Sequence, residues 1–248
     1  MPRPKFEILL DTPDLVAINK PPGLATIPGR GETTSALEQL AESLGIPSKG
    51  SADPRLRVVH RLDKDTSGVL LFAKHTQAQR HLSHQFQNNT IEKEYLALVA
   101  GAPPEREGQV DGKLAPHPTR PREMHVSRLG RPALTLWKLE AKFRIYSLLR
   151  VFPKTGKTHQ IRVHLRHIGL PLAIDPVYNR EAPAILLSAI KRDYSPSQHT
   201  ERPLINRLTL HAEKLRFVDL AGTKVEIIAP VPKDLRATVN QLSKLGVR

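Results

Sequence analysis

The chain has 248 residues, a formal net charge of +14 and no cysteine. At roughly 150 residues per domain this length corresponds to one or two domains, which can bury a core without disulfides or metals. The lack of cysteine excludes disulfides, thiolate nucleophiles and Cys-ligated metal centres. The excess of Lys and Arg favours a polyanionic partner, because each neutralised phosphate releases counterions. No signal-peptide core is present and no apolar run approaches the ~20 residues of a membrane span, so we expect a cytoplasmic protein with no membrane partner.

Short apolar runs bounded by turn residues predict strands, and apolar residues at helical spacing predict helices. In chain order we predict strands at residues 6–10 and 15–19, a helix at 35–44, strands at 57–60 and 69–73, a helix at 76–87, strands at 91–99, 133–143 and 146–152, a helix at 158–168, strands at 208–217 and 224–229, and a helix at 234–245. Ser35 is expected to cap the first helix and Gly45 to end it. Ile161, Leu165 and Ile168 are expected to form the buried stripe of the third helix.

Two stretches do not follow these patterns. Residues 101–131 are rich in Pro, Gly, Arg and His, and form either a long basic binding loop or irregular short strands. Residues 175–203 form a second irregular, polar insertion. Because strands outnumber helices and often follow one another directly, we predict an α+β fold with a largely antiparallel sheet.

One carboxylate stands out in the polar turn after the strand at residues 57–60. Asp63 lies between Arg61 and Lys64 at the strand end. A carboxylate held among cations stays ionised and is available as a nucleophile or as a charge stabiliser. The simpler interpretation is an ordinary tight turn, in which Asp, Thr, Ser and Gly bond to their own backbone.

A basic segment opens the predicted helix at residues 158–168. Residues 155–164 superficially suggest a phosphate-binding loop of an NTPase, but the glycine that this motif requires is replaced by Val151. A helix start that carries Lys157, His159 and Arg162 is still a candidate anion site, because free amides and the helix dipole point there. The alternative is a solvated basic helix face.

Histidine is frequent in this chain, and clustered histidines are common metal ligands. His159, His164 and His167 lie near one another, but they lack the spacing and the intervening Glu of a zinc protease, and no cysteine assists. We therefore predict no metal site. Tyr95, on the strand at 91–99, is by default a residue of the sheet face and becomes interesting only if it faces Asp63.

Five segments resemble the RluA-type RNA pseudouridine synthases, and they occur in that family's order. The segments are Asn19–Leu24, His60–Gly68, Lys93–Ala97, Thr155–His164, and Leu210–Ala212 together with Ala229-Pro230. The chain departs from the family pattern at Lys157, where Arg is usual, at Ile174, where Gly precedes Asp175, and at Asp219-Leu220, where His-Pro is usual. Residues 179–205 are longer than the usual connection. These departures leave the identity of the target RNA open.

The resemblance implies a pseudouridine synthase fold, with a central mixed, largely antiparallel sheet flanked by helices and loops and an RNA-binding cleft across it. It implies one catalytic domain over residues 1–248, made of two halves around one cleft, without the small S4 domain that many relatives carry. The activity implied is isomerisation of uridine to pseudouridine in a stem-loop of rRNA or tRNA. No redox step or group donor is involved, so no cofactor is expected, and we expect a monomer with no protein partner.

The resemblance also implies roles for single residues. Asp63 is similar to the family nucleophile, Tyr95 would lie against the target base and help with proton removal, and Arg162 would pair with Asp63. RNA contacts are implied for Arg61, which would fill the space left by the flipped nucleotide, and for His60, Lys157 and His159. Whether Asp63 forms a sugar adduct, assists a glycal route or first adds to the base stays open.

A different class of function keeps the same fold. The chain could be a non-catalytic basic RNA-binding or ribosome-assembly protein. Asp63 and Tyr95 are both present, which argues against this alternative, because a protein that only binds RNA needs neither.

Overall fold

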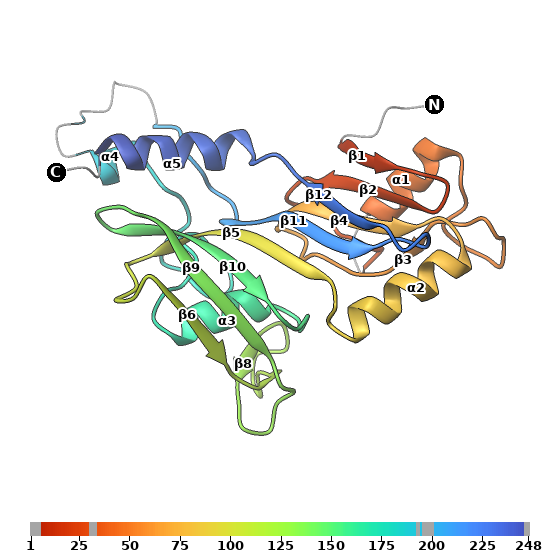
Figure 1. The fold of residues 1–248 in the computed structure, drawn as a ribbon. Coiled ribbons are helices and arrows are strands. Elements are labelled where there is room, and N and C mark those ends of the chain that lie inside the picture. The colour runs from red at the N-terminus through yellow and green to blue at the C-terminus, as the bar shows by residue number, and fades with distance from the viewer. Residues whose placement is uncertain (1–5, 30–33, 192–193, 195–200, 246–248) are drawn as a thin grey trace. The chain divides into compact units, whose positions relative to one another are not determined.

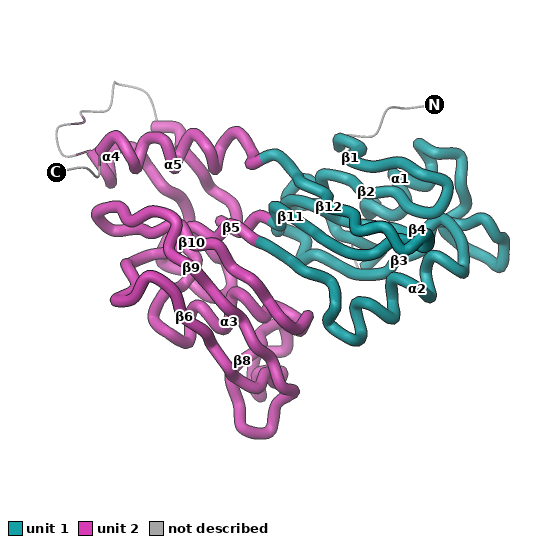
Figure 2. The backbone as a smooth tube through the Cα atoms, in the orientation of Figure 1, with its two compact units in different colours: residues 1–94, 212–230 teal, residues 95–211, 231–248 magenta. Residues whose placement is uncertain are grey.

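The computed structural model describes residues 6–29, 34–191, 194 and 201–245 (Figure 1). The chain divides into two compact units, which Figure 2 shows in different colours. Unit 1 comprises residues 1–94 and 212–230, and unit 2 comprises residues 95–211 and 231–248. In the described part of the chain, no helix is both long enough and apolar enough to span a membrane.

Unit 1 is a sheet with two helices. Its elements are β1 (Glu7–Asp11), β2 (Leu15–Lys20), α1 (Ala36–Leu44), β3 (Arg57–Val58), β4 (Ser67–Ala73), α2 (Thr76–Gln87), β12 (Lys224–Ile228), and parts of β5 (Glu92–Ala100) and β11 (Leu210–Val218). Hydrogen bonds give the strand order β1-β2-β4-β11-β5, with β3 also on β4 and β12 also on β11. Because β4 is a central strand, every one of its residues is buried. Its alternate residues Val69, Leu71 and Ala73 share a core cluster with Ala78 and Leu82 of α2.

Unit 2 holds the remaining strands and helices. Its elements, besides the rest of β5 and β11, are β6 (Glu107–Asp111), β7 (Leu114–Pro116), β8 (Met124–Val126), β9 (Leu134–Lys142), β10 (Tyr146–Pro153), α3 (Gln160–His167), α4 (Leu187–Ile190) and α5 (Lys233–Leu245). The main strand order is β5-β10-β9-β6, all antiparallel, and β7 pairs with β8 as a separate hairpin. Ile161 and Leu165 of α3 pack in the core of this sheet, and Leu235 and Leu242 of α5 pack in a second cluster.

The local predictions agree with these elements. Ser35 caps α1 by accepting the Glu38 N–H, and Gly45 ends it with a left-handed φ of 64°. Residues 101–131 form irregular short strands, β6, β7 and β8, so the alternative of one long loop is wrong. The central sheet is mixed and largely antiparallel, and α+β is the correct fold class.

Two expectations about the third predicted helix are wrong in detail. The helix α3 begins at Gln160 instead of residue 158, because His159 has a left-handed φ of 54°. Ile168 was expected in the buried stripe, but it follows the helix and is 37% exposed. In the second insertion the structure describes α4 and a bridge between Ile185 and Ile205, while residues 192–193 and 195–200 lie outside the described residues.

Candidate active site

A buried lysine, Lys20, is hydrogen-bonded to the loop that carries Asp63. Lys20 has no exposed surface, and its Nζ donates to the carbonyl oxygens of Pro21 (2.9 Å), Leu24 (2.9 Å) and Lys64 (2.8 Å). A buried ammonium is costly unless its protons are bonded, and here each of the three bonds reaches a backbone carbonyl. Lys20, from the segment Asn19–Leu24, thereby fixes the backbone at Lys64, directly after Asp63.

A threonine holds the residue directly before Asp63. The Thr26 hydroxyl donates to the Leu62 carbonyl (3.0 Å) and accepts the Leu62 N–H (3.2 Å). The Asp63 carbonyl in turn accepts the Thr66 N–H at 3.1 Å, which closes the turn. Leu62 and Thr66 are buried, whereas the Asp63 side chain is partly exposed. The loop therefore presents its carboxylate on a backbone that is fixed on both sides.

His60 is placed inside unit 1 by two contacts. Its Nε2 accepts the Leu71 N–H of β4 at 2.9 Å, and its ring stacks on Phe86 of α2 with centroids 4.7 Å apart. Burial, and secondarily the positive charge of Lys93, lowers the pKa of His60 to about 3. The imidazole is therefore neutral and anchors the segment between β3 and Asp63, while its neighbour Arg61 is exposed. An RNA contact by His60 stays a prediction.

Tyr95 lies on β5 in unit 2. It is directly opposite Val151 of β10 in the antiparallel register, and its partly buried side chain packs against the core cluster of that sheet. The ring is thus held by the sheet and retains an accessible side. Its role against a target base stays a prediction.

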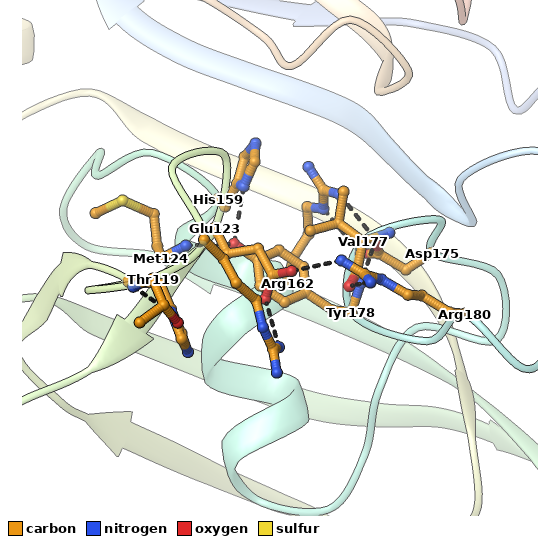
Figure 3. A network of polar contacts seen from close by, with 11 residues as sticks. Thr119, Glu123, Met124, His159, Arg162, Asp175, Val177, Tyr178 and Arg180 are labelled. Atoms are coloured by element: carbon orange, nitrogen blue, oxygen red, sulfur yellow. Dashed lines mark hydrogen bonds and ion pairs between the residues drawn. The ribbon is translucent and has the colours of Figure 1, made fainter.

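Arg162 is buried and forms an ion pair that the sequence analysis did not anticipate. Its Nε donates to Asp175 Oδ2 and its Nη2 to Asp175 Oδ1, both at 2.8 Å (Figure 3). The guanidinium carbon lies 5.0 Å from the centre of the Tyr178 ring. Only 5% of Arg162 is exposed, so the alternative of a solvated basic face is wrong for this residue. Removing one partner of such a buried pair typically costs about 3–5 kcal/mol. Pairing of Arg162 with Asp63 stays a prediction.

Tyr178 joins three segments through its hydroxyl. The oxygen accepts the Met124 N–H of β8 at 2.8 Å and lies 2.9 Å from Nδ1 of His159 (Figure 3). Burial raises the pKa of Tyr178, so the phenol keeps its proton.

The start of α3 differs from the predicted open anion site. The Lys157 N–H donates to the Gln160 side-chain oxygen at 3.0 Å, so this amide is already engaged. The charge of Arg162 is balanced by Asp175. Of the predicted cations at the helix start, partly exposed Lys157 and His159 remain the candidates for contact with an anion.

The two insertions meet at a buried carboxylate. Glu123 of the first insertion is 3% exposed and pairs with Arg120 at 3.1 Å. It also pairs with Arg180 of the second insertion at 2.6 Å (Figure 3). Part of the positive charge in both insertions is therefore compensated within unit 2. The arginine side chains themselves remain largely exposed.

His164, considered above for a metal site, has two other partners. It is fully buried, with Nδ1 2.9 Å from the Thr135 hydroxyl and Nε2 3.0 Å from the Gly112 carbonyl. Across the described ranges, no group of three or more His, Cys, Asp or Glu side chains is placed to hold a metal ion.

Sequence reasoning missed the residues that support the candidate side chains. Lys20, Thr26, Asp175 and Tyr178 all belong to this class. Asp175 had two usable signals: it is an acidic residue that directly follows the apolar run Leu170–Ile174 in a strongly basic chain, and the family pattern has Asp at this position. Lys20 lies in the segment Asn19–Leu24, but its bond to the Lys64 carbonyl, like the bonds of Thr26 to Leu62, joins residues far apart along the chain and leaves no local signal.

Comparisons with known proteins identify the family to which the chain belongs. Residues 14–167 match the family model described as RNA pseudouridylate synthase. The ribosomal large subunit pseudouridine synthase D of Nitrosomonas europaea is 38% identical over 97% of this chain and 66% of that protein. Its namesake in Escherichia coli (strain K12) is 34% identical over 93% of this chain and 68% of that protein. The chain thus spans about two thirds of the length of these curated relatives.

A solved structure shares the whole fold. Human RNA Pseudouridylate Synthase Domain Containing 4 superposes with a TM-score of 0.74 and 28% identity, covering 95% of this chain and 92% of that one. The family match runs from the strand β2, which ends at Lys20, through the Asp63 loop to the end of α3, which bears Arg162. The sequence match and the shared fold agree, and this chain belongs to the RNA pseudouridylate synthase family.

Proposed function

We propose that this chain isomerises uridine to pseudouridine in RNA, with Asp63 as the nucleophile. The observation that carries the proposal is the Asp63 loop, in which a partly exposed carboxylate follows a backbone held by Lys20 and Thr26. In the reaction the N1–C1′ bond breaks, the base rotates, and a C5–C1′ bond forms while C5 loses a proton and N1 gains one. A carboxylate suits this chemistry because it can meet positive charge as it develops at the anomeric carbon.

Two residues of unit 2 complete the proposed chemistry. We assign Tyr95 to the target base, where its phenol assists removal of the C5 proton. We assign Arg162 to the Asp63 carboxylate, which loses hydration when RNA covers it and would otherwise tend to protonate. Asp63 belongs to unit 1 and Arg162 to unit 2. Support for their pairing therefore comes from family membership and from the order of the motifs.

The proposed substrate is a stem-loop of ribosomal RNA, and a tRNA stem-loop is the alternative. The relatives at 38% and 34% identity are named as ribosomal large subunit enzymes, which favours ribosomal RNA. The net charge of +14 and the exposed Arg61 support contact with phosphates. We propose contacts from His60, Lys157, His159 and the two insertions, and we propose that residues 1–248 act as one catalytic domain, as a monomer, in the cytoplasm.

The decisive experiment replaces the proposed nucleophile. Asp63→Asn keeps the side-chain shape and removes the charge, so conversion of a uridine-containing rRNA hairpin should fall by roughly a thousandfold or more. Affinity for the hairpin should stay within about twofold, since the contacts to phosphates remain. Mass spectrometry of the digested RNA measures conversion, and fluorescence anisotropy measures binding.

Asp65→Asn is the matched control, because Asp65 is a second carboxylate of the same turn and is also partly buried. It should retain most of the turnover. Substantial conversion by Asp63→Asn, or a loss confined to Asp65→Asn, would show that the nucleophile is assigned wrongly. If the unmodified protein binds RNA tightly and converts no hairpin, rRNA or tRNA, the non-catalytic RNA-binding alternative is correct.

A further inference from the structure

Asp175 has every oxygen engaged in the interior of unit 2. Its Oδ2 accepts the Arg162 Nε–H at 2.8 Å, and its Oδ1 accepts Arg162 Nη2 at 2.8 Å. The same Oδ1 accepts the backbone N–H groups of Val177 at 2.9 Å and Tyr178 at 3.0 Å. Asp175 has no exposed surface. The turn at residues 175–178 thus fixes the carboxylate, and the carboxylate fixes one edge of the guanidinium.

The face of the same guanidinium is covered as well. The Tyr178 ring lies 5.0 Å from the Arg162 guanidinium carbon, and the Tyr178 hydroxyl is itself held by Met124 and His159 (Figure 3). A guanidinium is planar, so fixing one edge and one face determines the direction of its remaining N–H groups. Those groups, both on Nη1 and the second on Nη2, are not used by Asp175.

We propose that Asp175 is a positioning residue for the isomerisation: by holding the Nε and Nη2 edge of Arg162, it directs the other N–H groups toward the reacting carboxylate. The inference rests on the proposed function, in which Arg162 supports Asp63. Asp175 touches neither substrate nor reacting atoms in this proposal. Its whole effect on the reaction passes through the orientation of Arg162, because the bidentate contact removes the torsional freedom of the guanidinium.

The chain contains a second ion pair with the same atomic pattern, which serves as a control. In unit 2, Arg207 donates from Nε and Nη2 to the two oxygens of Asp234, each at 2.7 Å, and Asp234 also accepts the Leu235 N–H at 2.7 Å. Asp234 lies at the start of α5 and outside the family match at residues 14–167. This pair supports the fold and has no place in the proposed chemistry.

Asp175→Asn separates positioning from folding. The amide oxygen can replace Oδ1 and keep the bonds from Val177, Tyr178 and Nη2, while the amide NH₂ then faces the Nε–H of Arg162, donor against donor. We expect kcat on the rRNA hairpin to fall at least tenfold and KM to change less than twofold. Asp234→Asn should lower the melting temperature and leave kcat unchanged.

A double variant tests whether the effect passes through Arg162. In an Arg162→Lys background, which retains the charge without the fork, adding Asp175→Asn should change kcat by less than twofold. If Asp175→Asn lowers kcat by the same factor in both backgrounds, or leaves kcat unchanged in the otherwise native chain, the inference is wrong. If Asp175→Asn does not fold, Asp175→Glu keeps the buried charge and displaces the fork, and a native kcat in that variant overturns the proposal.

Failure of the proposed function gives a different result. In that case Asp63→Asn retains turnover, or no variant and no parent protein converts RNA. If Asp63→Asn abolishes turnover while Asp175→Asn behaves like Asp234→Asn, the proposed function stands and only the positioning role is excluded.

Discussion

His60, three residues before Asp63, has a pKa that depends on how the folded chain surrounds its imidazole. It accepts the Leu71 N–H and stacks on Phe86, and burial lowers its pKa to about 3, with a smaller effect from Lys93. The unfolded chain has an ordinary histidine at this position, with a pKa of about 6.5. The unfolded state therefore binds a proton that the folded state does not bind between these two values.

This difference predicts a pH dependence of stability. Because the unfolded state binds more protons, the free energy of unfolding should rise with pH between about 3 and 6.5, by up to about 1.4 kcal/mol per unit from His60. Acidification through this window removes the contribution. Gln in the His60→Gln variant can still accept the Leu71 N–H but does not titrate. The free energy of unfolding of this variant should therefore rise less steeply with pH, by the slope that corresponds to one bound proton. Urea unfolding from pH 4 to 7 measures both slopes, and equal slopes would contradict the assignment.

At the scale of elements, a glycine lets two buried strands approach closely. Gly68 is the second residue of β4, has a φ of +118°, and lies against β11. A Cβ built there would be 2.1 Å from the Ala212 carbonyl oxygen and 2.7 Å from its nitrogen. Both obstacles are backbone atoms, so no side-chain movement relieves the clash. The glycine that ends the Asp63 motif, His60–Gly68, is thus required by strand packing in unit 1.

Gly68→Ala should therefore destabilise the protein by about 2–4 kcal/mol, from the disfavoured φ and the overpacking together. Gly156→Ala is the matched control from the motif Thr155–His164, since no atom lies within 4 Å of a Cβ built at that position. It should change stability by less than about 1 kcal/mol. Chemical denaturation measures both. Equal destabilisation of the two variants would show that the packing between β4 and β11 is not the cause.

At the scale of the whole molecule, the net charge of +14 determines how the protein meets RNA. Several cations are already compensated internally, including Arg162 by Asp175 and Arg180 by Glu123. The uncompensated charge acts through phosphates, and it releases counterions when RNA binds. In the proposed function, long-range attraction therefore supplies affinity, and the fixed Asp63 loop supplies the chemistry.

The affinity should accordingly fall with salt. A plot of log affinity for the rRNA hairpin against log salt should be linear with a negative slope of about 0.7–0.9 per phosphate contacted. Lys157→Gln should make this slope less negative by about 0.7–0.9, the contribution of one phosphate contact. Anisotropy titrations between 50 and 300 mM KCl, roughly the range in which such effects are resolved, give both slopes. A flat plot would mean that the charge does not serve RNA binding.

The sequence by itself determined the elements whose causes are local. Ser35 and Gly45 bound α1 through contacts within a few residues, and α2 covers residues 76–87 as its apolar spacing predicts. The α+β class followed from the order of these elements. Asp63 was identified as a candidate because its neighbours in sequence are cations and because the surrounding motif resembles a known family. Such signals need no knowledge of what lies across the fold.

The tertiary structure alone decided which partners hold the candidate residues. Lys20 reaches the Lys64 carbonyl, Tyr178 reaches the Met124 amide, and Arg162 takes Asp175 as its carboxylate partner in unit 2. These partners are separated along the chain, and their meeting depends on packing the intervening strands and helices. The sequence shows where a charged residue lies along the chain. A charged side chain needs a partner only when it is buried, and its burial depends on the packing of the folded core.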